Sequence, residues 1–139
     1  MKSYIVIFLL FFSYGAFGQN NKPVIVIDFV KIENNKKPEA LYFYENNWKV
    51  YRDIALQKGY IKSYELLTTN PDTLNNFDLI LVTAYADSVQ FKTGEEHFNK
   101  IIKEARPNGP KLMDDAKPAE FRKTLFSKMA GSLFSGVAQ

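Results

Sequence analysis

The sequence predicts an α+β fold whose elements follow one another in the order β-α-β-β-α-β. Three runs rich in β-branched and aromatic residues, at 24–32, 60–69 and 77–86, have the composition of strands. Two further stretches carry apolar residues at the three- and four-residue spacing of amphipathic helices. The 139 residues are 46% hydrophobic and 24% charged, which is typical of one globular domain and excludes an intrinsically disordered chain.

The first strand and the helix after it have the clearest signals. Residues 24–32 (VIVIDFVKI) are apolar at successive positions through their first half, as in a strand that is covered on both faces. Pro38 suits the first turn of a helix, where its missing N–H leaves no hydrogen bond unmade. We expect this helix to run from about 39 to 58 and to stop at Gly59, which adopts a left-handed conformation at little cost. Its apolar stripe consists of Leu41, Tyr44, Trp48, Tyr51 and Ala55, widened by Phe43, Val50 and Ile54.

A hairpin and a second helix are expected next. Asn, Pro and Asp residues separate the runs at 60–69 and 77–86, so the two predicted strands should pair in antiparallel fashion. Thr93 and Glu96 have the spacing of a capping box, which predicts that the second helix runs from about 94 to 106. The side chains expected to be buried on this helix are Phe98, Ile101, Ile102 and Ala105.

The C-terminal region decides the topology. Residues 107–118 contain three prolines and should form a loop that turns helical around 118–122. Residues 124–134 fit either a fourth strand or the tail of a helix, because their apolar residues follow neither period. With a fourth strand, the order is the split βαβ, ferredoxin-like arrangement, in which two helices cover one face of an antiparallel sheet. The other face would then be apolar and in need of a partner, which predicts a homodimer formed sheet to sheet.

The first 18 residues have the pattern of a secretory signal peptide. Met1-Lys2 supplies a positive start, Tyr4 to Phe12 an apolar segment, and Ala16-Phe17-Gly18 a small-residue cleavage site. Nine apolar residues make about 13 Å of helix, which is too short for a bilayer core of roughly 30 Å. We therefore predict cleavage near Gly18-Gln19, no stable membrane anchor, and a single exported domain at 19–139 that is periplasmic or extracellular.

Composition removes several classes of site. The absence of cysteine excludes disulfides, a lipoprotein anchor and thiolate metal sites, and a single histidine makes multi-histidine metal sites hard to build. We assign no metal and no cofactor, because Asp114-Asp115 lacks the further ligands of a calcium loop and no Gly-rich phosphate loop occurs. The net charge is +3, and the Lys and Arg residues are interspersed with acidic residues along the chain. This argues against a nucleic-acid partner. We expect the solvated surface to include the basic pairs Lys36-Lys37 and Arg122-Lys123 and the helix residues Glu45 and Arg52.

Four segments carry a resemblance to a known superfamily. The strand VIVIDFVKI, the helix segment ENNWKVYRDIALQKG, the strand IKSYELL and the later FDLILVTAY together resemble the dimeric α/β barrel superfamily. The likeness covers roughly Val24 to Lys103 and is nearest to small exported proteins akin to the antibiotic-biosynthesis-monooxygenase and NIPSNAP-like groups. It implies a homodimer with a pocket between the sheet and the two helices of one subunit. It also implies activities that range from cofactor-free monooxygenation to haem binding and haem degradation.

The residues that haem-degrading members use are largely replaced here. Those members have an Asn on the first strand and both a Trp and a His on the second helix. This chain has Asp28 on the first strand, Trp48 on the first helix and only His97 on the second helix. Two of the three positions therefore depart from the pattern of haem degradation.

Two ionisable residues are candidates for catalysis. Asp28 lies in an otherwise apolar strand, and a carboxylate facing the pocket would be a proton acceptor, whereas one at the sheet end would pair with Lys or Arg. His97 could ligate haem iron or transfer a proton near neutral pH. Its polar neighbours favour a solvated position on the second helix instead.

Aromatic residues are the candidates for ligand binding. Tyr44, Trp48 and Tyr51 share one helix face, where they would either stack on a flat aromatic ligand or form ordinary core. Tyr64 and Tyr85 are strand residues that would add hydroxyls to the same cavity or pack against the dimer face.

Three functions follow from these alternatives. The first is an exported protein that binds a small apolar or aromatic molecule in an aromatic pocket between sheet and helices. The second is a cofactor-independent monooxygenase-like enzyme in which Asp28 or a tyrosine deprotonates a small phenolic substrate. The third is a structural or interaction dimer whose pocket is filled by its own side chains.

Overall fold

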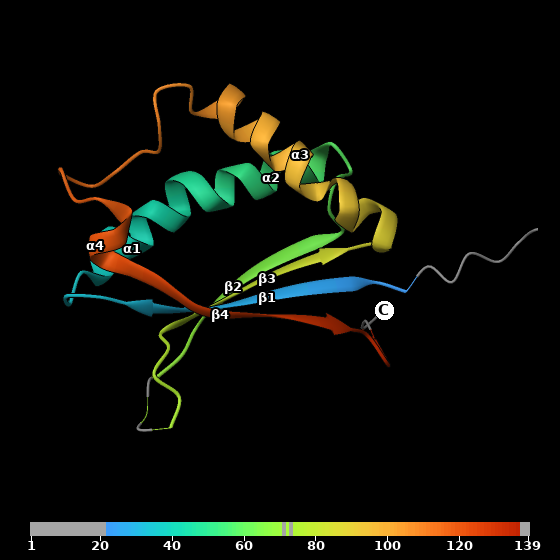
Figure 1. Cartoon of the computed structure of the whole chain (residues 1–139), viewed down its shortest axis with the longest axis horizontal. Helices are drawn as coiled ribbons and strands as arrows, with labels where there is room; N and C mark the ends of the chain where they lie inside the picture. The colour runs from blue at the N-terminus through green and yellow to red at the C-terminus, as the bar shows by residue number, and fades with distance from the viewer. Residues whose placement is uncertain (1–21, 71, 73, 137–139) are drawn as a thin grey trace, which may run out of the picture.

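A computed structural model describes residues 22–70, 72 and 74–136 of the chain (Figure 1). These residues form a four-stranded antiparallel sheet with the strand order β2-β3-β1-β4. The helices gather on one side of this sheet (Figure 1). The order of elements and of strands confirms the predicted α+β, ferredoxin-like fold. The strands are β1 (Val24–Ile32), β2 (Ser63–Thr68), β3 (Leu79–Tyr85) and β4 (Arg122–Gly131).

The first predicted helix is continuous but contains a wider turn. It consists of α1 (Lys37–Phe43), the π-helical turn η1 (Tyr44–Trp48) and α2 (Lys49–Gln57). Pro38 lies in its first turn, and Gly59 follows its end with a φ of +69°. None of the helices described is long and apolar enough to cross a membrane. The predicted signal peptide, residues 1–18, lies outside the described residues.

The second helix, α3 (Ser88–Ala105), starts six residues earlier than predicted. The side chain of Asp87 caps it by accepting hydrogen bonds from the N–H groups of Val89 (2.9 Å) and Gln90 (2.8 Å). Thr93 lies inside the helix, and its hydroxyl donates to carbonyls of the preceding turn. The predicted capping box at Thr93 and Glu96 is therefore wrong. The helix ends before Pro107, as expected, with Ile101 buried, Phe98 and Ala105 half-buried and Ile102 39% exposed.

The C-terminal segment forms a strand. A short helix, α4 (Pro118–Phe121), precedes β4, which starts at Arg122 and pairs with β1. The pairing shifts register between Phe29 and Val30, which pair with Phe126 and Thr124, so Leu125 is an extra residue in β4. Of the two alternatives left open by the sequence, the fourth strand is the one observed.

Two core clusters lie between the sheet and the helices. In the first, Val30, Leu79 and Leu81 pack against Tyr44 and Trp48. The second cluster consists of Tyr51, Ala55, Ile61, Tyr85 and Ile101. Both clusters join the helix layer to the sheet, and their strand members mark the covered face.

The opposite face of the sheet is apolar on its two central strands, with Lys128 and Glu65 on the edge strands, and no described helix lies over it (Figure 1). Successive side chains of a strand point to opposite faces, so the residues between the core positions of β1 and β3 lie on this open face. Phe29 lies here, with its ring stacked on Phe126 (centroids 4.5 Å apart) and edge-on to Phe77 (4.9 Å). We call this surface the open sheet face; its other apolar members are Ile25, Ile27, Ile80 and Val82.

Candidate functional site

A cavity of about 280 Å³ lies between the covered face of the sheet and the helices. This central cavity combines aromatic and aliphatic walls with a small number of polar groups, as ligand sites in proteins commonly do. Its apolar and aromatic lining consists of Val30, Phe43, Tyr44, Trp48, Tyr51, Leu81 and Ile102. Its polar lining consists of Asp28, Arg52, Arg122 and Thr124.

Two other hollows differ from the central cavity in position. A groove of about 350 Å³ runs between η1 and the edge strand β2, and Tyr44 and Trp48 also line it. Tyr64 lies in this groove, where its hydroxyl donates to Asp53, which also accepts from the ammonium of Lys49 at 2.7 Å. The Lys49 hydrogen bond is the main cause that holds the pKa of Asp53 below its usual range.

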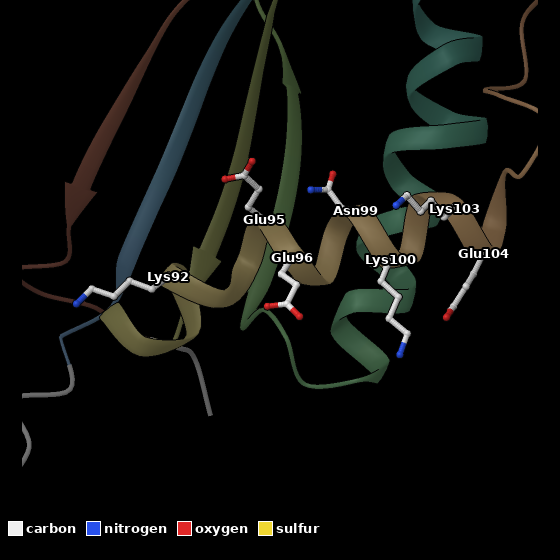
Figure 2. Close-up of a pocket in the computed structure, with 7 residues that line it drawn as sticks. All are labelled: Lys92, Glu95, Glu96, Asn99, Lys100, Lys103 and Glu104. Carbon is white, nitrogen blue, oxygen red and sulfur yellow. The ribbon is translucent and has the colours of Figure 1, made fainter.

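The third hollow, of about 670 Å³, is a feature of one helix surface. All seven of its lining residues come from α3, and their charged or polar side chains extend outward from that helix (Figure 2). Acidic and basic side chains are mixed along it, and no apolar residue lines it. It is therefore the solvated side of α3 and carries no site.

The turn η1 positions the aromatic wall of the central cavity. It places Tyr44, Asn47 and Trp48 among the buried residues, and such π-turns within α-helices occur frequently at functional sites. Asn47 is fully buried, and its side-chain amide holds both backbone groups of Lys111, donating to the carbonyl and accepting from the N–H, each at 2.7 Å. The loop after α3 is thereby fixed to the helix at the point where the helix widens.

Arg52 is half-buried and lines the cavity, so the predicted solvated position is wrong. Its guanidinium carbon lies 4.6 Å from the ring centre of Trp48 and 4.2 Å from that of Phe98. A guanidinium between two aromatic rings gains cation–π attraction and apolar contact at once. This burial lowers the pKa of Arg52 to about 10, which still leaves the group cationic near neutral pH.

Arg122 also lines the cavity and is not the solvated residue that the sequence predicted. Its guanidinium carbon lies 4.6 Å from the ring centre of Phe43 and 5.7 Å from that of Tyr44. Burial raises the pKa of the Tyr44 phenol, while the nearby Arg122 cation acts in the opposite direction. Within the described residues, the buried Tyr44 hydroxyl has no hydrogen-bond partner.

Asp28 lines the central cavity from β1. One of its carboxylate oxygens accepts a hydrogen bond from the Ser127 hydroxyl of β4 at 2.5 Å. In the described part of the chain it forms no ion pair with a lysine or arginine. The carboxylate is therefore placed where it can meet a molecule in the cavity.

The structure divides the other predicted site residues between different places. Tyr44, Trp48 and Tyr51 line the central cavity together, whereas Tyr64 lines the neighbouring groove. Tyr85 packs in the second core cluster, edge-on to Phe91, and is not part of the cavity lining. A Cβ added at Gly94 would lie 2.9 Å from the Tyr85 ring, so α3 approaches that ring closely.

His97 is likewise outside the lining of the central cavity. Its imidazole stacks on the Tyr60 ring, with centroids 3.6 Å apart and planes at 9°. His97 and Asp28 therefore do not share a site. Among the described residues, no group of three or more acidic, histidine or cysteine side chains could hold a metal ion.

The sequence did not predict that two arginines, Arg52 and Arg122, line the cavity. A signal for Arg52 exists, because it follows Trp48 by four residues and so lies on the same helix face. Arg122 has no comparable local signal, since its place depends on where β4 starts.

Comparison with known proteins agrees on the fold. No family model matches the sequence, and no curated protein matches it. HapK from Hahella chejuensis has a similar solved structure, with a TM-score of 0.53 and 11% identity, over 84% of this chain and 98% of that one. A putative antibiotic biosynthesis monooxygenase from Nitrosomonas europaea gives a TM-score of 0.47 and 14% identity, over 84% and 94% of the two chains. A dimeric ferredoxin-like protein of unknown function from Bacteroides fragilis gives 0.46 and 12%, over 82% and 97%. The likeness to HapK extends over nearly the whole of that chain and agrees with the predicted ferredoxin-like fold.

Proposed function

We propose that this protein is an exported binding protein for a small aromatic or apolar molecule, which occupies the central cavity. The observation that carries the proposal is the lining of that cavity, in which Tyr44, Trp48 and Tyr51 lie beside a carboxylate and two guanidinium groups. A filled core would bury aliphatic and aromatic side chains without leaving a volume of about 280 Å³ among them. The pattern at residues 1–18 supports export.

The test uses Trp48, which is the single tryptophan of the chain and lines the cavity. Titration with para-tert-butylbenzamide, a neutral aromatic probe, is expected to change Trp48 fluorescence in a saturable way. Ile102→Phe, which narrows the central cavity, should weaken binding about tenfold, in line with the cost of misfitting an apolar pocket.

The control is Leu41→Phe, which narrows the neighbouring groove instead. It should leave the affinity unchanged. A probe that fails to bind, or a loss of binding in Leu41→Phe alone, would contradict the assignment to the central cavity.

We also propose that the protomer forms a homodimer through the open sheet face. The support is the row of apolar side chains on that face, including Ile27, Phe29 and Val82, which no described helix covers. Exposed apolar patches of this kind typically mark protein interfaces. A second copy presents the same surface, as an isologous interface requires.

A second candidate function is a cofactor-independent monooxygenase reaction on a small phenol. The specific observation is that the Asp28 carboxylate, a potential proton acceptor, lines the same cavity as the cations Arg52 and Arg122, which would stabilise a phenolate. If the protein consumes dissolved oxygen when a phenol is bound, and Asp28→Asn abolishes this consumption, the enzymatic function is supported. If the phenol binds without oxygen consumption, only the binding function is supported.

A further inference from the structure

We infer that the ligand of the central cavity is an acid, an aromatic or apolar molecule whose carboxylate binds between Arg52 and Arg122. This inference rests on the proposed function of the cavity as a ligand site, and it names the chemical class of the ligand. Four observations lead to it, and each concerns the polar groups of the lining.

The first observation is how Arg52 is held. Its guanidinium lies over the rings of Trp48 and Phe98, at 4.6 and 4.2 Å from their centres. Aromatic rings supply no conventional hydrogen-bond acceptor, so these contacts leave the guanidinium N–H donors for another partner. The Nε of Arg52 is buried and has no hydrogen-bond partner among the described residues.

The second observation is that Arg122, at the start of β4, also lies against an aromatic ring, as Arg52 does on α2. Its guanidinium lies over the ring of Phe43 at 4.6 Å, and its buried Nε also lacks a partner in the described part of the chain. The Tyr44 hydroxyl beside it is also buried and forms no hydrogen bond with another described residue. Buried polar groups are nearly always hydrogen-bonded, so a ligand that supplies an acceptor to the two arginines of the cavity would satisfy donors that the described residues leave without partners.

The third observation is the charge of the lining. Asp28 is the one carboxylate among the lining residues, against two guanidinium groups, which leaves an excess of one positive charge. Asp28 is engaged with Ser127, and the ion pairs found in the described residues, Lys49 with Asp53 and Lys58 with Glu104, lie at the surface. A monoanion in the cavity would balance the excess, because buried charges are normally paired.

The fourth observation is the shape of the remaining lining. Val30, Leu81 and Ile102 offer no hydrogen bonds, so the body of the ligand meets apolar walls while one end meets the arginines. A planar carboxylate matches the fork of guanidinium donors, as in arginine–carboxylate pairs generally. The lining therefore fits a compact acid with a hydrophobic body.

The experiment compares two probes of the same shape, para-tert-butylbenzoate and para-tert-butylbenzamide, by calorimetry and Trp48 fluorescence. The full mature protein should bind the carboxylate about tenfold or more tightly than the amide, because charge-assisted hydrogen bonds are the stronger ones. Arg52→Gln and Arg122→Gln should each bring the two affinities close together. The ratio of the two affinities within one variant is insensitive to a general loss of stability, and circular dichroism verifies that each variant is folded.

The control is Lys103→Gln, which removes a positive charge from the outer side of α3 without touching the cavity (Figure 2). It should keep the full preference for the carboxylate. Equal affinity of the wild-type protein for both probes would overturn the inference and leave the binding function standing. Binding of neither probe would instead refute the binding function itself. A preference that survives in both arginine variants would show that these arginines do not recognise the anion.

Discussion

Replacing Asn47 by alanine is expected to lower the free energy of unfolding by about 3 kcal/mol. Asn47 is fully buried and bonds both the N–H and the carbonyl of Lys111, so its truncation removes both of these hydrogen bonds at once. It also accepts from the Arg106 guanidinium at 3.4 Å, which adds to the attachment of the loop. Urea denaturation followed by Trp48 fluorescence and circular dichroism measures the change.

Asn46→Ala is the matched control for this experiment. The neighbouring amide donates only to the Tyr42 carbonyl of its own helix, and its backbone oxygen, which accepts from Arg106, is unaffected by the substitution. Loss of the Asn46 side chain should lower the free energy of unfolding by about 0.5 kcal/mol. Equal losses in the two variants would contradict the role assigned to Asn47.

Val82→Lys on the open sheet face is expected to convert a dimer into a folded monomer. Val82 pairs with Ile27 in β1 and with Glu65 in β2, so a lysine there can pair with Glu65 in the separate protomer. The same ammonium buried between two sheets would lose its water, and this desolvation would oppose association by several kcal/mol. Light scattering coupled to size exclusion measures the mass of the assembly, and thermal unfolding measures the protomer.

Asn99→Lys serves as the comparison, because it adds the same charge on the exposed side of α3 (Figure 2). This variant should remain dimeric at the concentration at which Val82→Lys is monomeric. A wild-type monomer, or a dimer that persists in Val82→Lys, would show that the open sheet face is not the interface.

The strands could be predicted from sequence where their pattern is uninterrupted. The strands β1 and β3 were predicted from runs that are apolar at successive positions, and the antiparallel pairing of β2 with β3 from the turn residues between them. In β4 the residues from Phe126 onward pair with β1 without interruption, but each face mixes apolar and polar side chains, with Phe126 and Lys128 on one face and Ser127 and Met129 on the other, so no period fitted that segment. The bulge at Leu125 is set by pairing with the neighbouring strand and leaves no clear local signal.

The helix details depended on contacts that the sequence does not display. The start of α3 was missed because Val89 is 65% exposed, so the first turns of that helix carry no apolar stripe. The widened turn η1 was missed because spacings of three and four suit an α-helix and a π-turn alike. Its anchor, the bond of Asn47 to Lys111, joins residues 64 positions apart.

The aromatic part of the candidate site was predictable, whereas its charged part was not. Tyr44, Trp48 and Tyr51 share a helix face by their spacing, and the structure places all three on the cavity. Arginines are mostly solvated, so composition alone favours the surface for Arg52 and Arg122. Their burial results from stacking on rings, and the ring of Phe98 comes from a different helix.

The most direct test of the central cavity as a ligand site is a crystal structure of the protein with para-tert-butylbenzoate. We expect the hydrocarbon body of the probe against Leu81 and Trp48, with its carboxylate within hydrogen-bond distance of Arg52 and Arg122. A cavity closed by its own side chains, or a probe bound only in the groove beside Tyr64, would contradict the account.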